Sequence, residues 1–269
     1  MREARRAWAR GITSALLKPF WVDLHIHTLL SPCGELEMGA PEVIEKAREA
    51  GLDIIGIADH NTCENYPGMA GAALNGERPG VPVVLPCIEA QSAEDIHTLC
   101  VFPEYPLALE FKEWLWKRIR PIKNDVEHFG YQIVVDAENG IVKEEEVLLI
   151  QGAGYEVDQI VEKARALGGL AILAHVDRPA FSYTAALGPM PEDYPADAFE
   201  LSRRLNSDEA QKWRERYPGR AFIRSSDSHT LDTMSRANCT KMMLEAPTFE
   251  EIRMALRGEG GRRVSWPWG

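Results

Sequence analysis

FWVDLHIHT (residues 20–28) is the stretch of sequence on which the interpretation of the fold depends. Apolar residues alternate here with Asp23, His25 and His27, and this period of two predicts a β-strand with one apolar and one polar face. His25 and His27 therefore point to the same side. Two imidazoles at this spacing are about 7 Å apart along the strand and can converge on one metal ion. A half-buried strand without a metal is the alternative.

Composition and charge narrow the class of protein. The chain has 269 residues, of which 45% are hydrophobic, and is compatible with one barrel-sized domain over residues 1–269. The formal net charge of −11 makes long nucleic acid an unexpected partner, and a small anionic substrate would need a local concentration of positive charge. The five cysteines lack CxxC spacing, which predicts reduced thiols and a cytoplasmic location.

Two features of the sequence argue against a membrane protein. No run approaches the roughly 20 apolar residues of a membrane span. The basic segment 1–18 has interrupted apolar residues, so we expect a short amphipathic surface helix rather than a secretory signal, with a role at a membrane surface as the alternative.

A unit of helix, glycine, apolar strand and polar tip recurs along the chain. Helices are predicted at about 41–50, between 155 and 168, at 207–217 and at 249–256. Apolar strands are predicted at 53–58, within 81–91, within 168–179, at 197–202, within 220–229 and at 240–245. Polar side chains stand at the strand ends: Asp59, His60, Glu89, His175, Asp227 and His229. This order predicts a (β/α) barrel with its site at the C-terminal ends of the strands, with a doubly wound open sheet as the alternative.

The segment from Pro103 to Gly154 breaks this rhythm. Residues 111–130 predict a helix that ends near Pro121 and then a short helical piece, and residues 131–142 predict a hairpin around Asn139-Gly140. We interpret the segment as an insertion over the barrel mouth. A peripheral elaboration without a role in chemistry is the other interpretation.

Histidines are concentrated near the predicted strands. Six of the seven are placed there, namely His25, His27, His60, His97, His175 and His229. With Glu89 and Asp227 they make eight nitrogen and oxygen donors, a set that is costly to bury without cations. Histidine and carboxylate ligands without thiolates suit Zn²⁺, Mn²⁺ or Fe²⁺, and the number of donors predicts two or three ions.

The motifs DLHIHT, ADHN, the Glu89 to His97 segment, AHVDR and SDSH resemble, in order, those of the PHP (polymerase and histidinol phosphatase) family of metal-dependent phosphoesterases. The similarity covers nearly the whole chain and implies a distorted TIM-like barrel of seven β/α units with a trinuclear metal site. By motif, it implies a first ion bound by His25, His27, Glu89 and Asp227, a second by Glu89, His97 and His175, and a third by His60 and His229.

The resemblance also implies an acidic third-site ligand from the loop after the first strand. Family members often place it in an SDG-like turn, where this chain has SPCGELEM (residues 31–38). Glu37 is our prediction and Glu35 its closest rival. Cys33 is within reach, but a thiolate would favour softer metals. Asp59 is expected to orient a ligand rather than to bind an ion.

The chemistry of such a cluster predicts hydrolysis of a small phosphomonoester or nucleotide by a hydroxide that bridges two ions. Arg178 is the candidate for binding the phosphate, with an ion pair to Asp177 or another neighbour as the alternative. Asp59, His229 or a metal-bound water would protonate the leaving group.

Three other functions stay open. One is a C–N hydrolase of the amidohydrolase type, and another is a non-catalytic, metal-stabilised module. The third is an exonuclease on short RNA or DNA, since residues 112–123 interleave five basic residues with Trp114 and Trp116, which is also the pattern of an ordinary amphipathic helix.

Overall fold

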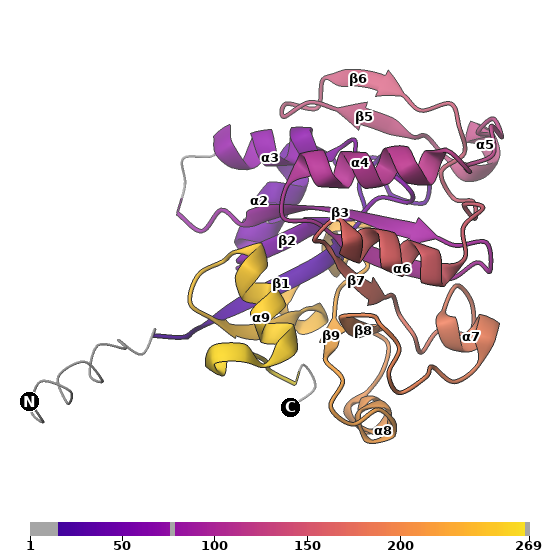
Figure 1. Cartoon of the computed structure of the whole chain (residues 1–269). Helices are drawn as coiled ribbons and strands as arrows, with labels where there is room; N and C mark the ends of the chain where they lie inside the picture. Colours follow the sequence, from indigo (N-terminus) through magenta and orange to yellow (C-terminus); the bar gives the residue numbers. More distant parts are fainter. Residues whose placement is uncertain (1–15, 76–78, 267–269) are drawn as a thin grey trace, which may run out of the picture.

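The structure is a computed structural model that describes residues 16–75 and 79–266 (Figure 1). Within these residues, nine strands form one nearly closed, barrel-shaped sheet in the order β11-β10-β1-β2-β3-β4-β7-β8-β9. The predicted class, an α/β distorted TIM-like barrel, is confirmed. The helix expected over residues 1–18 falls mainly on residues 1–15, which lie outside the described part.

The strands of the barrel are β1 (Lys18–Ile26), β2 (Ile54–Ile57), β3 (Val83–Gln91), β4 (His97–Val101), β7 (Leu170–Leu173), β8 (Ala198–Leu201), β9 (Phe222–Arg224), β10 (Thr240–Leu244) and β11 (Arg263–Val264). The pairs β1-β2, β2-β3, β7-β8 and β8-β9 are parallel. In contrast, β4 is antiparallel to both of its neighbours. Because β3 and β4 form a hairpin, His97 at the start of β4 lies near the same end of the barrel as Glu89 late in β3.

The helices around the barrel are α2 (Ala40–Ala50), α3 (Tyr66–Asn75), α6 (Val157–Ala166), α7 (Tyr183–Leu187), α8 (Ser207–Arg216) and α9 (Phe249–Arg257). Residues at the termini of α2 and α9 explain where these two helices begin or end. Pro41 lies in the first turn of α2, and Gly51 ends it with a φ of 65°, a conformation that glycine adopts without a Cβ clash. The Thr248 side chain accepts a hydrogen bond at the start of α9.

The hydrophobic core fills the inside of the ring and the space under the helices. One buried cluster contains residues from β1, β2, β3, β4, β7, β8, β9 and β10, so it occupies the barrel interior, and residues of α9 belong to it as well. Two further clusters lie between the sheet and the outer helices. Because this interior is apolar, we expect polar chemistry at the ends of the strands.

The strand with the two histidines is not the regular alternation that the sequence predicts. Its register with β2 shifts within residues 23–26. Leu24 belongs to the interior cluster, whereas Ile26 packs outside, in the cluster that includes α2. Such an irregularity changes the direction in which the side chains point. His25 and His27 still converge, and their rings are 5.1 Å apart.

The insertion contains α4 (Tyr105–Trp116), α5 (Val126–Phe129), β5 (Ile133–Val135) and β6 (Ile141–Glu144). The hairpin and the short helix are where the sequence predicts them. The longer helix ends at Trp116 instead of near Pro121, because the chain leaves the helix in tight turns in which the backbone NH of Arg118 donates to Leu115. The Asn61 side chain donates to backbone oxygens of the insertion at residues 149 and 151, both at 2.8 Å, so the insertion supports the loop beside His60.

The five cysteines are all free thiols. Among the helices that the structure describes, none has the length and hydrophobicity needed to cross a membrane.

Candidate metal centre

The first and last predicted motifs meet where the barrel closes. Ile26 forms a parallel bridge with Ser228, in which the backbone NH of His27 donates to Ser228 O at 2.9 Å. Asp227 and His229 flank Ser228. This contact therefore brings both of their side chains to the end of β1 that carries the two histidines.

Glu89 lies at the centre of the cluster and is almost fully buried, with 1% of its surface exposed. Its two carboxylate oxygens approach ring nitrogens of five histidines: His97 at 2.8 Å, His60 at 2.9 Å, His25 and His175 at 3.2 Å, and His27 at 3.3 Å. Imidazole nitrogens and carboxylate oxygens are ligands of divalent transition ions, so a carboxylate surrounded by five imidazoles suits a position between such ions.

Asp227 lies on the other side of the two β1 histidines. Its Oδ1 is 3.4 Å from His27 Nε2, 3.7 Å from His25 Nε2 and 3.6 Å from His229 Nδ1. Its Oδ2 accepts a hydrogen bond from the guanidinium of Arg178. Arg178 is thus at the edge of the cluster, in an ion pair with Asp227. Asp177, the other partner considered from the sequence, instead accepts from the backbone NH and hydroxyl of Ser202.

Three overlapping groups of donors are compact enough to hold an ion: His25, His27 and Glu89; His60, Glu89 and His97; and His27, His60 and His229. In each group the ligand atoms lie within 4.8 Å of one another. All eight motif residues belong to one cluster, and three of them, His27, His60 and Glu89, each take part in two groups. The distribution of ligands over individual ions stays a prediction.

Several buried polar atoms of the cluster form no hydrogen bond with the described residues: His60 Nδ1, Glu89 Oε2, His97 Nε2 and His175 Nδ1. His60 Nδ1 and Glu89 Oε2 lie 2.9 Å apart, but not in the geometry of a hydrogen bond. Leaving such atoms unsatisfied is costly. In addition, His25 Nε2 and His27 Nε2 face each other at 3.2 Å, while their Nδ1 atoms are held by Glu200 and Ser31. Inward nitrogens backed by an outer hydrogen bond are typical of metal-binding histidines. The residues therefore fit divalent cations.

The electrostatics of the cluster agree with this interpretation. Burial raises the pKa of Glu89 and Asp227, but the histidines that face them outweigh it, and both pKa values fall well below the ordinary range. Burial lowers the pKa of His97 to about 4. Burial also opposes the protonation of His27, but contacts with Asp227 and Glu89 raise its pKa to about 9. The two ionised carboxylates therefore favour a proton on some of the imidazoles that face them. Divalent cations can take the place of those protons.

Strained backbone marks three of the strand tips. Asn61, His175 and Asp227 have positive φ angles of 55°, 30° and 47°. For residues other than glycine, such conformations cost on the order of 1–3 kcal/mol each and persist only where the surroundings hold them. Each of these residues is a predicted ligand or adjoins one, so three of the six positive φ angles found at non-glycine residues in the described part of the chain lie at the candidate metal centre.

The loop after β1 touches the third group through a thiol. Cys33 Sγ lies 3.3 Å from His60 Nε2, and the backbone NH of Glu35 donates to His229 O at 2.9 Å. The side chains of Glu35 and Glu37 are exposed. In the described residues, no side-chain contact joins Glu37 to the cluster, and its role as a ligand stays a prediction.

Asp59 is buried beside the centre and faces the loop after β1. It accepts hydrogen bonds from the backbone NH and hydroxyl of Thr28 at 2.8 Å and from the hydroxyl of Ser31 at 2.7 Å. Ser31 Oγ in turn lies 2.9 Å from His27 Nδ1. Of the two roles considered for Asp59, this geometry supports the orienting one, acting through Ser31 on His27.

Glu200 is a site residue that the sequence reasoning missed. At the end of β8, its carboxylate oxygens lie 3.1 and 3.2 Å from His25 Nδ1, and it accepts from the backbone NH of His175 at 3.3 Å. It is 1% exposed. The available signal was its place late in the predicted strand 197–202, the same position that Glu89 occupies in its own strand.

Glu200→Gln is expected to weaken metal binding and to reduce any metal-dependent activity by about 10- to 100-fold, as loss of an outer hydrogen-bond partner of a metal ligand commonly does. Metal affinity would be measured by competition with a chelator of known affinity. Glu144→Gln, an exposed change on β6, is the matched control and should behave as the wild type. Unchanged affinity in Glu200→Gln would show that His25 does not depend on this carboxylate.

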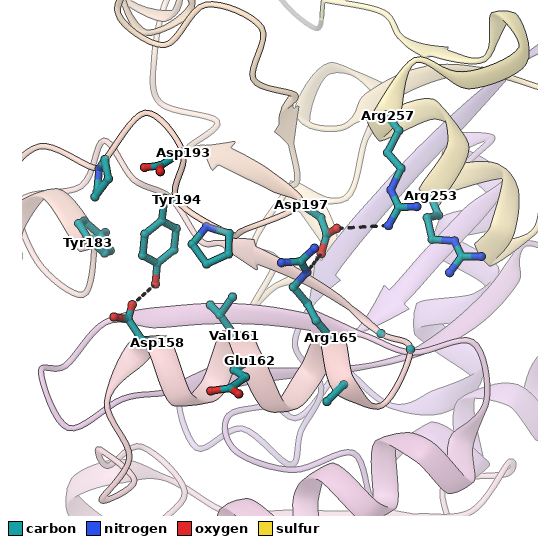
Figure 2. A pocket seen from close by; sticks show the side chains of 15 residues that line it. Asp158, Val161, Glu162, Arg165, Tyr183, Asp193, Tyr194, Asp197, Arg253 and Arg257 are labelled. Carbon is teal, nitrogen blue, oxygen red and sulfur yellow. Dashed lines mark hydrogen bonds and ion pairs between the residues drawn. The ribbon is translucent and has the colours of Figure 1, made fainter.

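A groove near α6 does not belong to this cluster. It has a volume of about 790 Å³ and lies beside α6 and α9 (Figure 2). Several of its polar groups contact one another: Asp197 lies 3.6 Å from Arg165 and 3.9 Å from Arg257, and Tyr194 donates to Asp158 at 2.8 Å. Asp197 precedes β8, at the end of that strand remote from Glu200. This groove therefore does not compete with the metal centre as the candidate site.

Comparison of the sequence with protein-family models and with curated proteins gave no match. Solved structures do match. Endonuclease Q from Pyrococcus furiosus, a lesion-specific endonuclease, is 22% identical with a TM-score of 0.62, and the alignment covers 92% of this chain and 58% of that one. A complex of Endonuclease Q with a 27-mer duplex that has an abasic lesion at the active site gives the same TM-score and identity, over 91% of this chain and 58% of that one. This chain thus spans 58% of the length of those neighbours.

Two further structures are described as phosphoesterases. A protein assigned as a metal-dependent phosphoesterase from Bifidobacterium adolescentis is 18% identical with a TM-score of 0.51, over 78% of this chain and 87% of that one. A two-domain protein from Bacteroides vulgatus contains a predicted PHP-like metal-dependent phosphoesterase and is 14% identical with a TM-score of 0.51, over 93% of this chain and 65% of that one. The resemblance to PHP proteins that the motifs indicate is confirmed at the level of the fold.

Proposed function

We propose that this chain, which has the fold of PHP-like metal-dependent phosphoesterases, hydrolyses a phosphoester with two or three bound divalent ions of Zn, Mn or Fe. The observation that carries the proposal is the buried Glu89 carboxylate with five imidazoles within 3.3 Å of its oxygens. A small phosphomonoester or nucleotide is the proposed substrate.

The side chains have distinct parts in this proposal. Ions bound by the eight motif residues would lower the pKa of a coordinated water and neutralise phosphoryl oxygens. Glu200 holds the His25 ring, and Asp59 acts through Ser31 on the His27 ring. Arg178 would bind a phosphate oxygen of the substrate, and its ion pair with Asp227 at the edge of the cluster supports this role. His229, with 28% of its side chain exposed, is accessible to the leaving group.

A nuclease is the second candidate, and it is favoured by the likeness to Endonuclease Q. The bound duplex in one neighbour means that this fold does not itself exclude long nucleic acid, although the net charge of −11 still argues against it. The run 112–123 supports the nuclease less than its sequence suggests. Trp114 stacks on Tyr155 at 3.9 Å, and Trp116 donates to Asn61 O at 2.8 Å, so both rings are engaged within the protein.

A substrate panel would test the proposal. Phosphomonoesters, nucleotides and short oligonucleotides would be assayed with added Mn²⁺, Zn²⁺ or Fe²⁺, and we expect metal-dependent release of phosphate from at least one small ester. Cleavage of oligonucleotides without release from monoesters would support the nuclease instead. Absence of hydrolysis of every phosphoester in the panel would contradict both.

Glu37→Ala is expected to lower the occupancy of one ion and to spare the other two, if Glu37 completes the group of His60 and His229. Elemental analysis of the purified variant would measure this. Glu35→Ala and Cys33→Ser are the comparison variants from the same loop. A full complement of ions in Glu37→Ala, together with the loss of one ion in either comparison variant, would refute the assignment to Glu37.

A further inference from the structure

The loop between β7 and α7 presents an exposed aromatic side chain beside the metal centre. Phe181 has 49% of its surface exposed and a φ angle of 57°. A positive φ is a genuine outlier for so bulky a residue. Exposed aromatic residues on an unstrained backbone are common and need no explanation, but a strained one has to be held in place by its surroundings.

Contacts hold this loop at several points. The backbone NH of His97 donates to Phe181 O at 3.1 Å. Ser182 Oγ donates to Arg178 O at 2.6 Å and accepts from the backbone NH of Ala185 at 3.2 Å, at the start of α7. These contacts hold the backbone on both sides of Phe181 in place.

The ring lies against a metal-ligand candidate. It stacks on the imidazole of His97, with centroids 5.0 Å apart and planes 27° from parallel. His97 itself is only 8% exposed, whereas about half of Phe181 is open to solvent. The same loop carries Arg178, the candidate phosphate ligand. A phosphate at the centre and a planar ring on Phe181 would thus be bound by neighbouring parts of one loop.

We propose that Phe181 is a specificity-determining residue that stacks a nucleobase adjoining the phosphate of the substrate. A rigid aromatic face favours a planar ring over a plain alkyl or sugar group, because base–aromatic stacking contributes substantially to binding and tolerates any base. This inference rests on the proposed phosphoesterase function and narrows its substrate to esters that carry a base.

The inference is tested with two ligands that differ only in the presence of the base. Their binding is measured rather than their turnover. The pair consists of non-hydrolysable phosphonate analogues of deoxyadenosine 5′-monophosphate and of 2-deoxyribose 5-phosphate, titrated calorimetrically into the metal-loaded full chain. We expect the nucleotide analogue to bind about tenfold more tightly to the wild type. Phe181→Leu, which keeps an apolar cover on His97, should abolish the difference, and Phe181→Trp should retain it.

The outcomes separate a substrate contact from a purely structural role. Equal binding of both analogues to the wild type, or a preference that survives in Phe181→Leu, would overturn the inference. An equal loss of affinity for both analogues in Phe181→Leu, together with loss of metal, would overturn it too. Phe181 would then act only by supporting His97. Repeating the pair within a trinucleotide, with and without the base, distinguishes a nucleic acid strand from a free nucleotide as the source of the ring. Failure of the proposed function is seen separately, as absence of hydrolysis across the substrate panel.

Discussion

Glu89→Gln is expected to abolish activity, with a loss greater than the roughly 100-fold that marks the upper end for an outer partner of a metal ligand. The reason is that Glu89 is shared by the donor groups that contain His25 and His97, so an uncharged amide weakens more than one ion site at once. Elemental analysis should show fewer ions per chain than in the wild type. Activity against the best substrate of the panel is the second measurement.

The substitution is nearly isosteric, so packing around residue 89 should be preserved and circular dichroism should match the wild type. Glu144→Gln again serves as the control for a lost surface carboxylate. A Glu89→Gln protein with its full complement of ions and with more than a tenth of wild-type activity would contradict the central role given to this side chain.

Removal of the ions with a chelator is expected to lower the melting temperature by roughly 15–30 °C. An ion present at a thousand times its Kd adds about 4 kcal/mol to the free energy of unfolding, so two ions add about 8 kcal/mol, and 1 kcal/mol corresponds to about 2–4 °C for a chain of this size. Without cations, the buried carboxylates and imidazoles keep their unsatisfied atoms. Calorimetry before and after chelation measures the shift.

Restoration of the melting temperature by added Mn²⁺ or Zn²⁺ would exclude an irreversible effect of the chelator. The Glu89→Gln variant offers an internal control, because a chain that holds fewer ions should show a smaller shift. An identical melting temperature with and without chelator would mean that the cluster is stable without cations.

The strand tips could be predicted from the sequence because an apolar run that ends in a polar residue is a local pattern. His60, His175 and Asp227 each follow such a run, and the structure gathers them at one end of the barrel. The PHP-like motifs added the order in which these tips occur. Local periodicity was therefore sufficient to find most members of the cluster.

Features that depend on contacts between distant segments could not be predicted in the same way. The shifted register within residues 23–26 arises from pairing with β2, and the antiparallel course of β4 arises from the hairpin with β3. Glu200 belongs to no motif, and its importance comes from its approach to His25, which is 175 positions away. The contact of Cys33 with His60 likewise depends on how the loop after β1 folds back.

The closure of the barrel between Ile26 and Ser228 has a consequence for the order of assembly during synthesis. The Asp23 side chain accepts a hydrogen bond from the Ser226 backbone NH, 203 positions later in the chain. Contacts this remote form late, because a long loop must close first. A nascent chain that has not yet produced β9 lacks Asp227 and His229 and exposes an incomplete set of imidazoles. We therefore expect tight metal capture to be a final event of folding, so that a tightly bound ion indicates a chain that has been made and folded through its last motif.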